Sequence, residues 1–319
     1  DGYALAEEKA RRKFSAIHRM TEHYPDRIGL ANTPDEFEAI AARGRKVAMI
    51  GIENGYVIGK ELSRLEEFYN MHARYMTIAH NGHNDICDSS GPLVRLGDVE
   101  EEHGGVSNFG YQVIDEMNRV GMMVDISHVS IKCMMQATKY SKAPVIASHS
   151  GVWELAKHSR NLNDEQLMAI GAAGGVVQIV GLNSFVKFYP DKGSEISIIR
   201  NAAALAAGDK EWDSSKHNSD PIYIAAMDII DKKYPAATVK DFVDHIDYAV
   251  NLIGVEHVGI VSDFDGGGGI EGWNDASETM NVTAELISRG YSEEDIAKIW
   301  SENTIALWRR VDAAAADIQ

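Results

Sequence analysis

The stretches VAMIGIE (residues 47–53), MMVDISH (122–128) and APVIASH (143–149) each run from apolar residues into a side chain that can bind a metal ion. Short apolar runs bounded by glycine and proline are typical of buried parallel strands. In a (β/α) barrel, the side chains at the carboxyl ends of the strands line the active site. The three stretches therefore predict a parallel sheet with Glu53, His128 and His149 gathered at one edge, where they would hold a metal ion.

The rest of the chain alternates between candidate strands and helices. Six strands are expected, and they end near residues 53, 80, 128, 149, 180 and 264. A closed (β/α)8 barrel needs eight strands, and six parallel strands leave two open edges. Either the sheet is open, or two strands precede Asp1. We expect the second: an α/β fold, a TIM-like (β/α)8 barrel without its first two strands, with residues 1–319 as one domain and residues 186–240 as a polar insertion.

The charge and the cysteine content exclude several classes of protein. The chain has 31 Lys and Arg residues and 48 Asp and Glu residues, a formal net charge of -17. This charge disfavours nucleic acid and anionic membrane as partners. No apolar run approaches the ~18 residues needed to span a bilayer, so membrane insertion is not expected. Cys87 and Cys133 do not make a disulfide framework, and the compartment stays open between periplasmic or secreted and cytoplasmic.

The three predicted ligands have the chemistry of a hydrolytic metal site. Two histidines and one glutamate are a known catalytic zinc set that leaves a position for water. Each residue alone is more often structural, but Ser-His recurs at the ends of two neighbouring strands, and such strands lie ~4.8 Å apart. Zinc would bring the pKa of bound water near neutrality and would polarise a carbonyl.

Further side chains are candidates for catalysis and substrate binding. Asp263 follows the last strand and could carry a proton to a leaving group; Asp265 is the weaker candidate, and either carboxylate could instead cap the turn at residues 266–269. His80 precedes a long polar loop and could stabilise an oxyanion. The guanidinium of Arg160 suits bidentate capture of a substrate carboxylate, although a surface ion pair would also explain it.

Five stretches match, in order, the motifs of one known family. They are GIENG (51–55), RYMTIAHN (74–81), DISHVS (125–130), PVIASHS (144–150) with SRN (159–161), and VGIVSDFDG (258–266). With these motifs the chain resembles the membrane (renal-type) dipeptidases, zinc dipeptidases of the amidohydrolase-like superfamily. The match covers nearly the whole sequence, and the ordered agreement is more specific than any single motif.

The resemblance implies a role for each candidate residue. Glu53 would bridge two zinc ions, and His128 and His149 would complete the second zinc site. His80 would contact the substrate carbonyl, Arg160 would hold the substrate carboxylate, and Asp263 would handle the proton. The implied reaction is hydrolysis of dipeptides by a metal-activated hydroxide, including substrates with a C-terminal D-residue. Members of the family are often dimers, so a homodimer is expected.

One departure from the family pattern concerns the first metal. The family's first strand carries a His-x-Asp pair, and this chain begins after it, so we expect two zinc ions per intact chain and one if the pair is truly absent. His83 and Asp85 imitate that pair, but they lie in the loop after His80. They are expected to be a solvated loop or a substrate loop more than ligands.

Two alternatives to a dipeptidase stay open. A barrel hydrolase of another amide, lactam or lactone would share the metal site, and only the carboxylate-binding role of Arg160 favours peptides. A non-hydrolytic relative that binds a peptide-like ligand, or that assists maturation of a peptide product, would be favoured by loss of the first-metal ligands. The number of metal ions per chain distinguishes the hydrolase from the binding protein.

Overall fold

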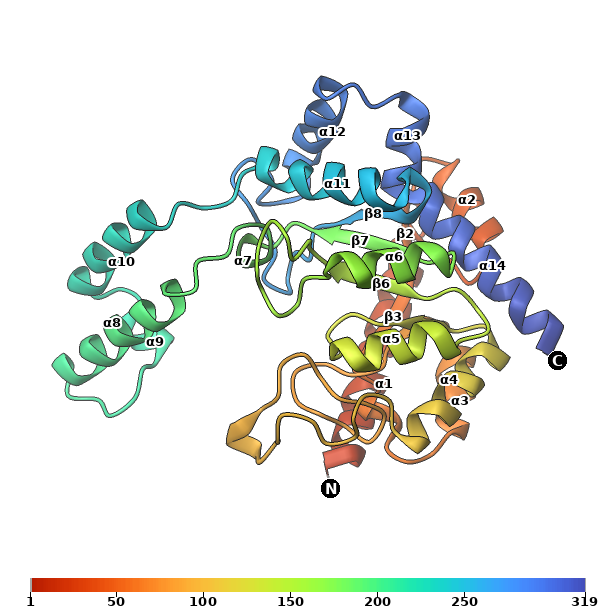
Figure 1. The fold of residues 1–319 in the computed structure, drawn as a ribbon, viewed down its shortest axis with the longest axis horizontal. Coiled ribbons are helices and arrows are strands. Elements are labelled where there is room, and N and C mark those ends of the chain that lie inside the picture. Colours follow the sequence, from red (N-terminus) through yellow and green to blue (C-terminus); the bar gives the residue numbers. More distant parts are fainter. Residues whose placement is uncertain (1, 319) are drawn as a thin grey trace.

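A six-stranded parallel sheet forms the centre of the computed structural model, which describes residues 2–318 (Figure 1). The strands lie side by side in chain order, and all neighbouring pairs are parallel: β3 (Ile50–Glu53), β4 (Ala73–Thr77), β5 (Met123–Asp125), β6 (Ile146–Ser150), β7 (Val176–Val180) and β8 (Val258–Val261). The α/β class and the six predicted strands are confirmed, although β4, β5 and β8 end three residues before the predicted ends at residues 80, 128 and 264. All six carboxyl ends therefore meet at one edge of the sheet. In the described residues β3 and β8 are its outer strands, and closure of the barrel by preceding strands stays a prediction.

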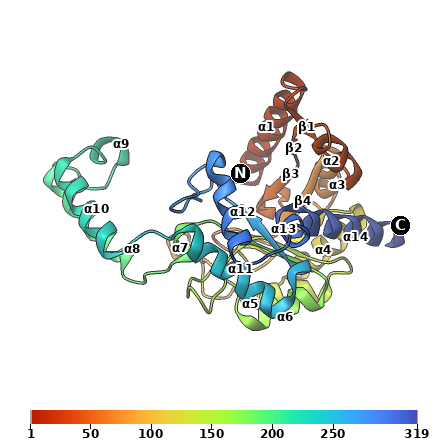
Figure 2. The same cartoon turned by 90° about the horizontal axis from the view of Figure 1, so that it is seen from above.

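Helices follow the strands and cover the sheet (Figure 2). They are α3 (Ser63–Asn70), α4 (Asn108–Val120), α5 (Ile131–Tyr140), α6 (Asp164–Ala172) and α11 (Val239–Ile253). Most of these helices begin with a side-chain cap, such as the capping box of Asn163 and Gln166 before α6. Helix α4 ends at Gly121, whose φ of 83° suits glycine. These local signals explain why the predicted helices form where they do.

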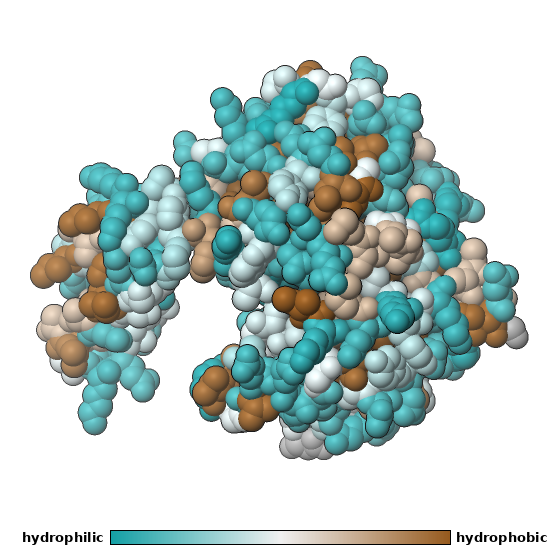
Figure 3. Space-filling model, in the orientation of Figure 1, coloured by the Kyte–Doolittle hydropathy of each residue, from teal (hydrophilic) through white to brown (hydrophobic). Residues whose placement is uncertain are grey.

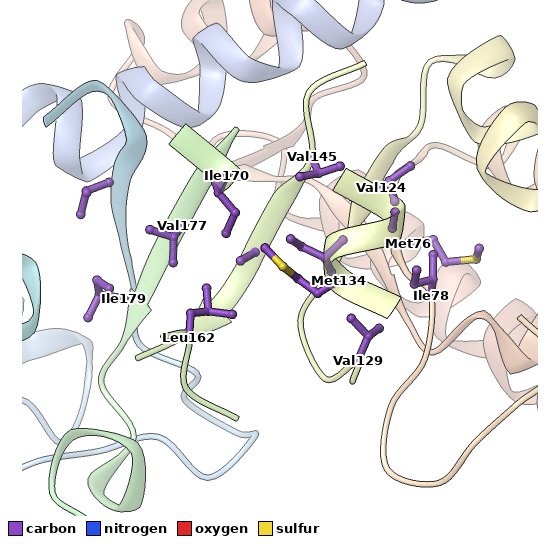
Figure 4. Packing of buried hydrophobic residues seen from close by; sticks show 14 of the residues in the cluster. Met76, Ile78, Val124, Val129, Met134, Val145, Leu162, Ile170, Val177 and Ile179 are labelled. Carbon is purple, nitrogen blue, oxygen red and sulfur yellow. The ribbon is translucent and has the colours of Figure 1, made fainter. Parts of the chain in front are cut away.

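The core lies between the strands and the covering helices. Figure 4 shows Met134 of α5 and Ile170 of α6 among side chains from the strands, including Val124 and Val177. All four side chains are at most 1% exposed. Burying a side chain of this size stabilises the fold by about 1.5–3 kcal/mol, so this packing holds the carboxyl ends of the strands in place.

The first predicted strand is in fact two strands. Residues 46–48 form β2 (Lys46–Ala48), which pairs with β1 (Ile28–Leu30) in a separate two-stranded parallel sheet. Only Ile50–Glu53 joins the main sheet as β3. The apolar run is continuous through the break at Met49, so the hydrophobic pattern alone gave no sign of the division.

The remaining helices lie before and after the sheet. Before it are α1 (Gly2–His23) and α2 (Pro34–Ala41). After it are α12 (Thr279–Ser288), α13 (Glu293–Ala297), the π-helical segment η5 (Lys298–Glu302) and α14 (Asn303–Ile318). Across residues 2–318 no helix combines the length and the apolar character needed to cross a membrane.

The predicted insertion forms a helical arm that projects from the body (Figures 1 and 2). The arm consists of α8 (Lys192–Ala206), α9 (Ser214–His217) and α10 (Pro221–Lys233), and the short helix α7 (Asn183–Val186) precedes it. A small aromatic cluster of Trp212, His217 and Tyr223 packs inside it. Hydrophobic side chains also lie on its surface (Figure 3), among them Ile198, Leu205, Ile222 and Ile229.

Candidate metal and substrate site

Glu53 is the last residue of β3, and its carboxylate lies among three imidazoles. Its Oε1 is 3.2 Å from Nε2 of His128, 3.3 Å from Nε2 of His149 and 3.5 Å from Nε2 of His80. The close contacts of its carboxylate with the imidazoles of His128 and His149 hold the pKa of Glu53 below its usual value. The structure thus brings the three predicted ligands to one point, and His80 joins them there.

His128 lies three residues beyond the end of β5, in a turn with a φ of 68°. Its carbonyl accepts a hydrogen bond of 2.8 Å from the amide of Ser90, so the long loop holds this backbone in place. Burial lowers the pKa of His128 to about 4. A neutral imidazole is the form that binds a metal, so burial prepares His128 for that role.

His80 is closer to the other ligands than the sequence indicated. Its ring centroid is 3.9 Å from that of His128, and the hydroxyl of Ser89 donates to its carbonyl. Single ligand atoms of Glu53, His80 and His128 all lie within 4.8 Å of one another. His80 can therefore either ligate a metal or face a substrate beside it, and its predicted catalytic and substrate-binding role stays a prediction.

Arg160 lies next to this group in a buried position. It is 7% exposed, and its Nη2 donates to the carbonyl of His149 at 3.2 Å. Its Nε is buried without a hydrogen-bond partner, and within residues 2–318 no carboxylate forms an ion pair with it. Burial lowers its pKa to about 10. A buried cation without an anion is costly, and this cost would be offset by a bound carboxylate.

Asp263 follows β8 and lines a cavity of about 250 Å³ together with Glu53 and His149. Burial raises the pKa of its carboxyl group. The following turn wraps closely around it: its carbonyl accepts hydrogen bonds from Gly266 and Gly268. A Cβ on Gly268 would lie 1.9 Å from the carbonyl oxygen of Ser262, so this glycine is required by close approach.

The other candidates form no hydrogen bond or ion pair with Glu53, His128 or His149 within the described residues. Asp265, the weaker acid candidate, is exposed. The side chain of His83 is fully buried in the loop; its Nδ1 accepts from the amide of Ser89 and its Nε2 pairs with the carbonyl of Val99 at 2.8 Å. Asp85 accepts from Tyr3 and pairs with Lys60. His83 therefore has a structural role inside the loop, and the expectation of a solvated loop is wrong for it.

The donor set fits a zinc ion. Carboxylate oxygen and imidazole nitrogen are ligands that zinc prefers, and three imidazoles face one carboxylate oxygen here. The Nε2 atoms of His128 and His149 approach to 2.7 Å, the distance of a hydrogen bond, so in the absence of a metal ion one proton lies between them. A metal ion would satisfy all four donors at once.

One residue of the site was missed by sequence reasoning. Asp125, the last residue of β5, is fully buried and accepts hydrogen bonds from the hydroxyls of Thr77 and Ser148. Ser148 in turn contacts Nδ1 of His149 at 2.8 Å. The sequence did contain a signal for this residue, because Asp125 ends an apolar run. A carboxylate in such a buried position needs several hydrogen-bond donors around it.

A parallel α/β sheet with a carboxylate and imidazoles at its carboxyl edge is the arrangement of barrel-type metal-binding proteins. A family model described as "Membrane dipeptidase (Peptidase family M19)" matches residues 5–319. The chain belongs to this family.

Curated relatives and solved structures agree with this assignment. The chain is 32% identical over 301 residues to dipeptidase tcpJ of Claviceps purpurea, covering 94% of this chain and 59% of the relative, and 30% identical over 305 residues to dipeptidase aclJ of Aspergillus oryzae, covering 95% and 61%. The chain thus spans about three fifths of these relatives. The crystal structure of the probable dipeptidase PvdM from Pseudomonas aeruginosa has a TM-score of 0.83 and 33% identity, covering 97% of this chain and 81% of that one.

A more distant structure shares the fold alone. It is a metallo peptidase from Rhodobacter sphaeroides, liganded with a phosphinate mimic of the dipeptide L-Ala-D-Ala, with a TM-score of 0.71 and 22% identity. The match covers 93% of this chain and 72% of that one.

Proposed function

We propose that this chain is a zinc-dependent dipeptidase that hydrolyses the single peptide bond of a dipeptide. The observation that carries the proposal is the convergence of Glu53, His128 and His149 at one point, beside a buried Arg160 that forms no ion pair within residues 2–318. A metal site alone would suit many hydrolases. A buried guanidinium next to it specifies a small substrate with a carboxylate close to the scissile bond.

The metal would be held by Glu53, His128 and His149, with His80 beside them. When bound, zinc supplies Lewis-acid polarisation of a carbonyl and a water of lowered pKa. Two imidazoles and one carboxylate suffice to hold one zinc ion and leave a position for water. The low pKa of His128 keeps its imidazole neutral at physiological pH, so no proton competes with the metal there.

Arg160 would bind the C-terminal carboxylate of the substrate. Its guanidinium is anchored by the hydrogen bond to the carbonyl of His149, which fixes it next to a ligand residue. A planar guanidinium binds a carboxylate through two parallel hydrogen bonds. Fixing that end of the substrate places the peptide bond near the ligands, and this positioning lowers the entropic part of the barrier.

Asp263 and His80 would act on the scissile bond from the cavity. Burial raises the pKa of Asp263, which improves a carboxylate both as a proton acceptor and, once protonated, as a donor to the leaving amine. Burial lowers the pKa of His80, which favours the neutral imidazole. A neutral imidazole can donate one N–H to a developing oxyanion.

The D-residue part of the proposal has a separate support. The Rhodobacter sphaeroides structure of the same fold is liganded with a mimic of L-Ala-D-Ala. If this chain recognises the substrate mainly by its carboxylate, through Arg160, and less by the side chain of the C-terminal residue, both L-L and L-D dipeptides should be substrates.

Hydrolysis of a panel of L-L and L-D dipeptides, with added zinc and with a chelator, tests the proposal. We expect turnover that requires zinc and falls sharply for tripeptides and for N-acetylated amides without a carboxylate. Zinc binding without turnover of any dipeptide would contradict the hydrolase and would favour a non-hydrolytic peptide-binding protein. Turnover of amides that lack the carboxylate, at the rate of dipeptides, would favour a different hydrolase.

A further inference from the structure

The buried carboxylate of Asp125 receives four hydrogen bonds from three neighbouring strand ends. Its Oδ2 accepts from the hydroxyl of Thr77 at 2.5 Å and from the hydroxyl of Ser148 at 2.6 Å. Its Oδ1 accepts from the amides of Ser127 and Ser148 at 3.0 Å each. Four donors on two oxygens saturate an ionised carboxylate. Asp125 therefore joins β4, β5 and β6 at the edge where the ligands lie.

The hydrogen bonds fix the position of a proton on His149. The single hydroxyl proton of Ser148 is used in its bond to Asp125, which can only accept. Ser148 Oγ also lies 2.8 Å from Nδ1 of His149. With its own proton committed, Ser148 must accept there, so His149 carries its proton on Nδ1 and a lone pair on Nε2.

That lone pair faces the candidate metal position. The Nε2 of His149 is 3.3 Å from Oε1 of Glu53 and 2.7 Å from Nε2 of His128. The backbone amide of His149 also donates to the hydroxyl of Ser127 at 3.0 Å, so the main chain of this residue is held as well. The opposite tautomer would direct an N–H at the metal position and could not ligate.

We propose that Asp125 is a positioning residue that acts through Ser148 to keep His149 in the tautomer that binds the metal. Mutation of a carboxylate that orients a metal-ligating histidine typically weakens metal binding by about 10- to 100-fold. Here the carboxylate acts through an intervening hydroxyl. His128 has no such support, because its Nδ1 is buried without a hydrogen-bond partner. The inference rests on the proposed function only in naming zinc as the ion.

Two substitutions separate the chain of hydrogen bonds from general packing. Ser148→Ala removes the acceptor for His149. Thr77→Val is the matched control, because Thr77 is also buried and donates to the same oxygen of Asp125, but within the described residues it forms no hydrogen bond with His149. Ser148→Thr keeps the hydroxyl and serves as the rescue.

The measurement is the dissociation constant of zinc, by competition with a chromophoric chelator, for each variant of the full chain. We expect Ser148→Ala to bind zinc about 10- to 100-fold more weakly, Thr77→Val to stay within about threefold of the parent chain, and Ser148→Thr to recover most of the loss. Equal weakening by Ser148→Ala and Thr77→Val would show that only packing matters and would overturn the proposal. So would unchanged affinity in Ser148→Ala.

Nitrogen-15 NMR of the imidazoles in the metal-free parent chain gives a second, direct test. We expect the signature of a proton on Nδ1 of His149, and its loss or averaging in Ser148→Ala. A proton on Nε2 of His149 in the parent chain would overturn the proposal, even if Ser148→Ala did not fold. Neither zinc affinity nor the NMR signature depends on hydrolysis. If both agree with the expected results but the chain cleaves no dipeptide, the proposed function is refuted and the role of Asp125 is not.

Discussion

Replacing Arg160 by alanine should lower kcat/KM for substrates that have a free C-terminal carboxylate much more than for substrates that lack one. The guanidinium is 7% exposed, has one hydrogen bond to the carbonyl of His149, and forms no ion pair within the described residues. If a substrate carboxylate is its missing partner, truncation removes one half of a buried charged pair. That loss costs about 2–5 kcal/mol, which corresponds to about 30- to 5,000-fold in kcat/KM.

The assay compares kcat/KM for one dipeptide and for the same dipeptide with a C-terminal amide. In Arg160→Ala the dipeptide should lose about 30-fold or more, whereas the amide, already a poor substrate, should change less than about threefold. Arg160→Lys should lose less than alanine for the dipeptide, because it keeps the charge but not the planar pair of donors.

Arg309→Ala is the control. Arg309 is a partly exposed arginine whose ion pairs with Asp35 and Glu38 lie on the surface, and its loss should leave both substrates unchanged. Equal losses of dipeptide and amide in Arg160→Ala would refute the reasoning, because they would show that Arg160 supports the structure and does not recognise the carboxylate.

Three further predictions follow from the same contacts. Chelation of zinc should abolish turnover, and adding zinc back should restore it. Glu53→Gln should weaken zinc binding at least tenfold, because the ligand oxygen between three imidazoles loses its charge. Full zinc affinity of this variant, measured by chelator competition, would contradict the role of Glu53. Burial raises the pKa of Asp312 to about 6, so the folded chain binds this proton more tightly than the unfolded chain, and the free energy of unfolding should fall by about 1–2 kcal/mol as pH rises from about 4 to 6. Asp312→Asn should remove that part of the pH dependence. The free energy of unfolding in urea is compared at pH 4.5 and pH 7, and the same difference in the variant as in the parent chain would contradict the prediction. Gly268→Ala should lower stability by about 1–3 kcal/mol and reduce turnover, because its Cβ would meet the carbonyl of Ser262 at 1.9 Å; Gly193→Ala, with no atom within 4 Å in helix α8, should be neutral or slightly stabilising in thermal unfolding.

The six strands could be predicted because their signal is local. Buried parallel strands are continuous apolar runs, and the runs before Glu53, His128 and His149 are readable without tertiary information. The two-stranded sheet could not be predicted in the same way. Strands β1 and β2 have three residues each, and such short segments carry little hydrophobic pattern of their own.

The ligands could be named from the sequence, but their supports could not. Asp125 is bound by Thr77, 48 residues earlier, and by Ser148, 23 residues later, and no local pattern shows that these side chains meet. The same reason applies to His83. Its two ring nitrogens are satisfied by backbone groups 6 and 16 residues away in the loop. The sequence does not show these partners, so it predicted a solvated side chain where the structure has a buried one.

Three residues in or beside the ligand group have a left-handed backbone without being glycine. The φ angles are 104° for Asn54, 68° for His128 and 54° for Asp263. Such conformations cost of the order of 1 kcal/mol each and persist only where the surroundings enforce them. Glycine at these positions would relax the backbone but would remove the imidazole and the carboxylate. The sequence that would make this scaffold most robust therefore differs from the sequence that can work, and a search for thermostable variants would drift toward inert ones unless it also selected for metal binding.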